Sequence, residues 1–141
     1  MQQALRDKCF THVGKDANGH KNTYTFCAYS NVQQHVVEEA VTFKVGSYQG
    51  WALAKEQAPA SSKAGKPAAT LYSAQLYEGG DSCGPTISRA TVVVFHCDSA
   101  MTTPTLIKAA EVSVCKYRLD MSLAEWCEVE EKGLAGKYEG E

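Results

Sequence analysis

The segment CGPTISRATVVVFHC, residues 83–97, decides the fold of this chain. Its centre, residues 91–96, is rich in β-branched and aromatic side chains, which predicts a buried strand, and a cysteine stands at each end. A second apolar segment, EVSVCKYRL at residues 111–119, contains Cys115, and Cys127 follows it. If the four cysteines pair with one another, the two segments form a rigid double strand that can support a binding site. The polar side chains it would hold are Arg89, Glu111 and Tyr117.

The bulk composition excludes several classes of protein. A chain of 141 residues with a net charge of -2 and no basic stripe is one globular domain without a nucleic-acid partner. No apolar run of about 18 residues is present, so we expect no membrane span. The usual catalytic, phosphate-binding and metal-binding motifs are absent, so we expect no metal, no cofactor and no enzyme. The enzymatic alternative is a glycosidase with Glu111 and Asp81 as its carboxylate pair.

Six cysteines are present and none of them forms a Cys-x-x-Cys pair, which argues against a structural zinc site. An even number in a chain of this size predicts a disulfide framework and an oxidising compartment. The connectivity stays open at this level, and reduced cysteines packed as small hydrophobic residues are the alternative. The first residues lack the apolar segment of a signal peptide, which indicates a mature form or a domain cut from a longer precursor.

Short segments with strand character alternate with turn formers along the chain. Strands are predicted at residues 9–13, 23–27, 36–45, 70–77, 91–96 and 111–119. Loops or turns are predicted at residues 14–22, 46–53, 78–81 and 98–104, and the second of these leads into another strand. A disulfide between Cys9 and Cys27 would staple the first two strands together. This pattern is typical of an all-β sandwich or flattened barrel.

One domain is predicted to span residues 1–127. Residues 55–69 contain no large apolar side chain and are predicted to be a flexible insertion loop within this domain, because strand signals resume directly after them. Residues 128–141 form a charged tail outside the cysteine framework.

Several polar residues lie a few positions before or after a cysteine in the sequence. Gln34 follows Cys27 by seven positions and Arg89 follows Cys83 by six, while Glu111 precedes Cys115 by four. Further elements of the same pattern are Cys9-Phe10, Tyr24-Thr-Phe-Cys27, Val32-Gln-Gln34, Tyr77-Glu-Gly-Gly, Cys97, Tyr117 and Cys127. In this order they resemble the mannose-6-phosphate receptor homology (MRH) domain, a family of lectin domains. The resemblance extends from residue 8 to residue 127 without the insertion.

The resemblance implies a flattened β-barrel of two packed antiparallel sheets. It also implies three disulfides, Cys9–Cys27, Cys83–Cys115 and Cys97–Cys127. The mannose-binding residues would be Gln34, Arg89, Glu111 and Tyr117. In the family the glutamine and arginine face the axial 2-hydroxyl, and the glutamate and tyrosine face the 3- and 4-hydroxyls. These residue types suit a sugar, because hydroxyls both donate and accept hydrogen bonds.

Each residue of this set also has an ordinary structural role open to it. Arg89 and Glu111 could form a surface ion pair, and Tyr117 could belong to the core. Gln33 could replace its neighbour Gln34 in the site. Trp51 could be a core aromatic residue or could stack on a second sugar.

Differences from relatives indicate which branch of the family this chain resembles. The ER-degradation lectins have two tryptophans where this chain has Lys21 and Asn22. The metal-assisted phosphomannose receptors have a longer loop with a histidine before the third cysteine, and this chain has neither. The sequence is most similar to the lectin domain of the glucosidase II β subunit, although Ala28 and Gly84 replace a proline and a tryptophan common in relatives.

We therefore expect a non-catalytic lectin domain that binds high-mannose N-glycans. Its expected partner is a catalytic glycosidase α subunit, and its expected location is the endoplasmic reticulum lumen or elsewhere in the secretory and endolysosomal pathway. Alternatives within the family are the phosphotransferase γ subunit, an ER-degradation lectin and a mannose-6-phosphate receptor. An alternative of another class is a protein-interaction module of the same fold that binds no glycan.

Overall fold

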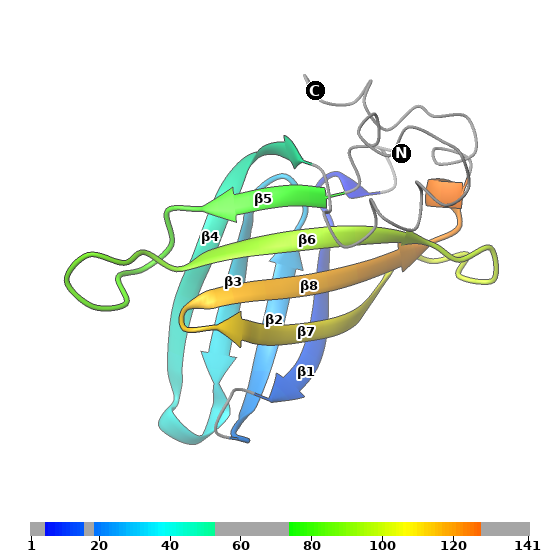
Figure 1. Ribbon diagram of the computed structural model, residues 1–141. Coiled ribbons are helices and arrows are strands. Elements are labelled where there is room, and N and C mark those ends of the chain that lie inside the picture. Colours follow the sequence, from blue (N-terminus) through cyan, green and yellow to red (C-terminus); the bar gives the residue numbers. More distant parts are fainter. Residues whose placement is uncertain (1–4, 16–18, 53–73, 128–141) are drawn as a thin grey trace.

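The computed structural model describes residues 5–15, 19–52 and 74–127, and this part of the chain is almost entirely β-structure (Figure 1). Alternating burial along the strands matches the period of two in the sequence; in β2, for example, every second side chain is buried. The elements are β1 Cys9–Lys15, β2 Lys21–Cys27, β3 Asn31–Val36, the 3-10 turn η1 Val37–Glu39, β4 Val41–Ala52, β5 Ala74–Glu78, β6 Ala90–Cys97, β7 Thr105–Ser113 and β8 Lys116–Leu123.

All eight strands belong to one sheet, in the order β1-β2-β3-β4-β5-β6-β8-β7. The sheet folds over itself, so that β5 to β8 form one layer across β1 to β4 (Figure 1). Its two edges approach each other closely, since a Cβ on Gly14 of β1 would lie 2.6 Å from the backbone oxygen of Ala109 in β7. The predicted flattened barrel is confirmed, with the two layers formed by halves of one sheet. One pair of neighbours, β6 and β8, is parallel rather than antiparallel.

Three disulfides hold this sheet, and they are the pairs that the resemblance implies. Cys9 and Cys27 are directly opposite each other in β1 and β2. Cys83 and Cys115 join the segments that precede β6 and β8. Cys97, the last residue of β6, is bonded to Cys127, which follows β8. The parallel pair is therefore tied at both ends.

The core between the two layers is rich in aromatic residues. Trp126 stacks on Trp51 at 5.7 Å between ring centroids, and Phe95 packs against both. Phe26 and Tyr77 meet edge to face at 5.5 Å. All five rings are buried, which anchors the fold around them.

The strand predicted at residues 36–45 is wrong, because the chain reverses direction in its middle. β3 ends at Val36, η1 follows, and Ala40 takes a left-handed conformation at φ 53° before β4 begins. Val36 and Val41 become partners in the antiparallel pair. The sequence hides this reversal, since the stretch contains no glycine, asparagine or proline.

The tight turn predicted at residues 46–53 is also wrong, because β4 runs through it as far as Ala52. Its glycines serve other purposes. A Cβ on Gly46 would lie 2.2 Å from the backbone oxygen of Tyr77, so this position admits only glycine. The strand register shifts between Tyr48 and Gly50, which indicates a bulge.

The segment at residues 111–119 is two strands and not one. β7 ends at Ser113 and β8 begins at Lys116, with Cys115 in a left-handed conformation at φ 60° in the turn. The loop predicted at residues 14–22 is shorter than expected, since β1 and β2 extend into it. The insertion at 55–69, the first residues of the strand predicted at 70–77, and the tail at 128–141 lie outside the described residues.

Candidate functional site

A row of three side chains crosses the first layer of the barrel. Tyr24 in β2 is directly opposite Gln34 in β3, and Gln34 is directly opposite Phe43 in β4. Directly opposed residues in an antiparallel pair point to the same face of the sheet. Tyr24 and Gln34 are buried, whereas Phe43 is partly exposed.

Arg89 and Tyr117 reach this row from the second layer. The guanidinium carbon of Arg89 lies 3.9 Å from the centre of the Phe43 ring, a close cation–π contact. A guanidinium nitrogen of Arg89 donates a 2.9 Å hydrogen bond to the hydroxyl of Tyr117. The Tyr117 ring in turn contacts Tyr24, at 6.2 Å between centroids. The five side chains therefore form a closed ring of contacts, which we call the polar ring: Tyr24, Gln34, Phe43, Arg89 and Tyr117.

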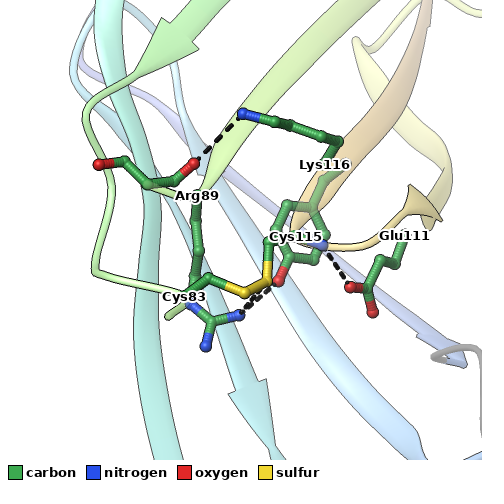
Figure 2. Close-up of a disulfide and its surroundings, with 7 residues drawn as sticks. Cys83, Arg89, Glu111, Cys115 and Lys116 are labelled. Atoms are coloured by element: carbon green, nitrogen blue, oxygen red, sulfur yellow. Dashed lines mark hydrogen bonds between the residues drawn. A yellow bond between two sulfur atoms is a disulfide. The ribbon is translucent and has the colours of Figure 1, made fainter. Parts of the chain in front are cut away.

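Glu111 stands next to the polar ring as the strand partner of Tyr117. One of its carboxylate oxygens accepts a 2.7 Å hydrogen bond from the backbone N–H of Cys115. Figure 2 shows Arg89 and Glu111 on either side of the Cys83–Cys115 disulfide. Glu111 thus fixes the hairpin turn with one oxygen, and this partly exposed residue keeps its second carboxylate oxygen as an acceptor.

Two polar atoms of the ring are covered without a hydrogen-bond partner within the described part of the chain. They are the side-chain oxygen Oε1 of Gln34, an acceptor, and Nε of Arg89, a donor. Each covered polar atom left without a partner costs about 1–3 kcal/mol. The same condition holds for Gln75 Nε2 and Trp126 Nε1, but these are lone donors in the core. Within the described ranges, the polar ring brings such an acceptor and such a donor into one set of contacts, and a ligand hydroxyl is the kind of group that can pair with either.

The four residues predicted to bind mannose are thus brought together, although their contact with a sugar stays a prediction. Gln33 is exposed and points away from buried Gln34, so it is not part of the ring. No ion pair joins Arg89 to Glu111 in the part of the chain that the structure describes. Sequence reasoning missed Phe43, since its position opposite Gln34 follows only from the strand register.

Trp51 is a correction to the predicted site. The sequence left open whether it stacks on a second sugar or belongs to the core. Its exposed fraction is 6%, and it packs between Phe95 and Trp126. It is therefore a core residue.

The two carboxylates of the glycosidase alternative have separate structural partners. Asp81 accepts a 2.9 Å hydrogen bond from the backbone N–H of Lys44, and Glu111 accepts one from Cys115. No hydrogen bond connects the two among the described residues. Within the same ranges, no group of three His, Cys, Asp or Glu side chains could hold a metal ion, and no helix is long and apolar enough to cross a membrane.

A second polar cluster lies on the outward face of β8, and we call it the Asp120 cluster. Arg118 donates two hydrogen bonds to the Asp120 carboxylate, at 3.2 and 3.0 Å, and His96 lies 2.6 Å from it. Burial alone would raise the pKa of Asp120, but the hydrogen bonds with Arg118 and His96 outweigh it and hold the pKa below its ordinary value.

Solved structures of lectin domains share this fold. The MRH domain of glucosidase II β bound to mannose superposes with a TM-score of 0.53 and 18% identity, over 89% of this chain and 98% of that one. The MRH domain of Yos9 complexed with the glycan alpha3,alpha6-Man5 gives a TM-score of 0.59 and 14% identity, over 91% and 82%. No protein-family model and no curated protein matches the sequence.

The class that the fold defines is therefore a disulfide-bonded, flattened β-barrel. More particularly, the chain has the fold of an MRH domain, and the likeness covers most of its length.

Proposed function

We propose that this chain is a lectin domain whose polar ring and Glu111 bind a mannose residue of high-mannose N-glycans. The observation that carries the proposal is the covered acceptor of Gln34 and the covered donor of Arg89 in one ring of contacts. A sugar hydroxyl both donates and accepts, so sugar hydroxyls supply the partner that each of the two atoms lacks. Glu111 supplies a charged acceptor for a neighbouring hydroxyl, and two proteins of this fold were solved with mannose or a mannose glycan.

The shape of the site supports weak binding of one sugar unit. Phe43, Arg89 and Glu111 are partly exposed and form its rim, while Gln34 and Tyr117 form its floor. Because the floor atoms are covered, a sugar reaches them only when a rim side chain moves, and Phe43 on top of Arg89 is the side chain placed to do so. The energy of that movement offsets part of the binding energy.

The proposal extends to a cellular role. Weak recognition of one mannose suits a non-catalytic subunit that holds glycans close to a partner enzyme. We propose a role like that of the glucosidase II β subunit, with a catalytic α subunit as the partner. Three disulfides favour an oxidising compartment, and we propose the endoplasmic reticulum lumen or another part of the secretory and endolysosomal pathway. In this role the chain itself is not an enzyme.

A glycan array with graded high-mannose and phosphorylated structures tests the proposal. We expect binding to the high-mannose glycans, loss of that binding in Arg89→Ala, and retention of it in the matched control Lys116→Ala. Lys116 is exposed, and its ammonium donates a hydrogen bond to the Ser88 carbonyl, so the control removes the same charge outside the ring (Figure 2). Unchanged binding by a folded Arg89→Ala would overturn the proposed site.

An array without any binding would favour a protein-interaction module of the same fold. One observation points to that second candidate. Ile87, Val112 and Val114, close to the Cys83–Cys115 disulfide in sequence, have exposed fractions of 42%, 60% and 75%. A pull-down that recovers a partner from wild type but not from Val114→Lys would then support it.

A further inference from the structure

The orientation of the Gln34 side-chain amide is fixed by a residue outside the polar ring. Asn22 in β2 is fully buried, and its side-chain nitrogen donates a 2.9 Å hydrogen bond to the backbone oxygen of His20. A backbone oxygen only accepts, so the nitrogen of Asn22 must face His20. The side-chain oxygen of Asn22 consequently faces the other way.

That oxygen accepts a 3.1 Å hydrogen bond from the side-chain nitrogen of Gln34. Turning the Gln34 amide over would bring two oxygens together in a buried place, which is unfavourable. The chain from His20 through Asn22 to Gln34 therefore has a single orientation. It leaves Gln34 Oε1 as the atom that has no partner.

We propose that Asn22 is a positioning residue that makes Gln34 an obligatory hydrogen-bond acceptor in the site. This inference rests on the proposed sugar-binding function. With Gln34 fixed as an acceptor and Arg89 able only to donate, a ligand group that pairs with both side chains must donate to one and accept from the other. The site thereby selects a free hydroxyl, and rejects a position where the hydroxyl is replaced by an acceptor without a hydrogen.

The strand geometry explains why Asn22 can act in this way. Asn22 and Tyr24 are two residues apart on β2, so both point to the face of the sheet that carries Gln34. Gln34 thus receives support from Asn22 while it faces Tyr24 directly. A leucine at position 22 would fill similar space without holding the amide.

The test measures selectivity rather than affinity alone. Wild type and Asn22→Leu are titrated by NMR with methyl α-mannoside and with its four mono-deoxyfluoro analogues, in which fluorine can accept but not donate. Besides the analogue that lacks the hydroxyl donating to Glu111, we expect a second analogue, with fluorine at the position that faces Gln34, to bind wild type about tenfold more weakly than the parent, because a site built to pair with a hydroxyl rejects a ligand that lacks it. In Asn22→Leu the amide can turn, and this ratio should fall to about threefold or less.

Two further variants keep the result interpretable. Asn22→Asp retains an oxygen that accepts from Gln34, so the ratio of wild type should be preserved in the folded variant, while its second oxygen opposes the His20 carbonyl and lowers stability. Asn22→Ser is too short to hold the amide and replaces Asn22→Leu if the latter does not fold. A purely structural role for Asn22 would lower affinity for parent and analogues alike and leave their ratio unchanged, which would overturn the inference.

Failure of the proposed function has a different signature. If wild type binds none of the mannosides, the proposed function is wrong and this inference falls with it. If wild type binds the parent sugar without a penalty at any single fluorinated position, only the role of Asn22 and Gln34 is wrong.

Discussion

The polar ring and the Asp120 cluster share strand β8 but lie on opposite faces of it. In the Asp120 cluster the carboxylate is paired with Arg118 and His96, and these contacts lower its pKa. In the polar ring an acceptor on Gln34 and a donor on Arg89 are covered without partners among the described residues. A satisfied buried cluster needs no further partner, whereas an unsatisfied one calls for a partner such as an ordered water or a ligand. The contrast separates a structural feature from a candidate binding site.

Removal of the two disulfides beside β6 and β8 should have the largest effect. The double variants Cys83→Ala/Cys115→Ala and Cys97→Ala/Cys127→Ala each open a loop of similar length, 32 and 30 residues. The chain-entropy relation predicts that each loses about 4 kcal/mol of stability, measured by denaturant unfolding. Below their melting temperatures, only the first should also lose mannose binding, because Arg89 and Glu111 flank that disulfide. Equal loss of binding in both would contradict this.

A matched pair of arginine substitutions comes next. Arg89→Met should weaken mannose binding by about 3 kcal/mol, since it removes more than one charge-assisted hydrogen bond. It should change the melting temperature little, because loss of the bond to Tyr117 is offset by removal of the covered, unpartnered Nε. Arg118→Met should leave binding unchanged and lower stability by about 2 kcal/mol, because Asp120 loses two hydrogen bonds. NMR titration and thermal unfolding on both variants check the pair. If Arg118→Met weakened mannose binding and Arg89→Met lowered stability instead, the Asp120 cluster and not the polar ring would be the binding site.

Replacement of one acid at each site by its neutral amide compares the polar ring with the Asp120 cluster again. Glu111→Gln retains an oxygen for the N–H of Cys115 but exchanges its other oxygen for a donor, so binding should fall about tenfold with the hairpin intact. Asp120→Asn should lower stability by about 1.5 kcal/mol without a change in binding. Wild-type affinity in Glu111→Gln would show that Glu111 accepts the hydrogen bond from Cys115 but does not contact the sugar.

The smallest effect concerns acid pH. A carboxylate with a lowered folded-state pKa stabilises the fold above its unfolded pKa, about 3.8 for Asp120, and this stability is lost as the pH falls through the folded value. The melting temperature should therefore decline below about pH 4, and Asp120→Asn should decline less steeply than wild type. Parallel curves for the two proteins would show that Asp120 contributes nothing to acid unfolding.

The sequence predicts the barrel and, through the family resemblance, three of the five ring residues, Gln34, Arg89 and Tyr117, better than it predicts the turns. Alternating burial and cysteine spacing are local patterns, and β2 and β6 follow from them directly. The reversals at Ala40 and Cys115 contain no glycine, asparagine or proline, so their left-handed conformations are seen only in the strand pairing on either side of them. Phe43 and Asn22 acquire their roles only through contacts across strands, which no single segment records.

The strand order β6-β8-β7 has a consequence for how the protein reaches its native state. Cys83 and Cys97 stand on either side of β6 and are both made before β8, the strand that brings their proper partners. Oxidation at that moment would give non-native pairs such as Cys83 with Cys97, and would leave Cys115 and Cys127 without their native partners. Native folding then depends on thiol–disulfide exchange after the β7–β8 hairpin has docked, a reaction that takes seconds to hours without a catalyst. A protein disulfide isomerase should therefore accelerate the recovery of this fold more than a stronger oxidant does.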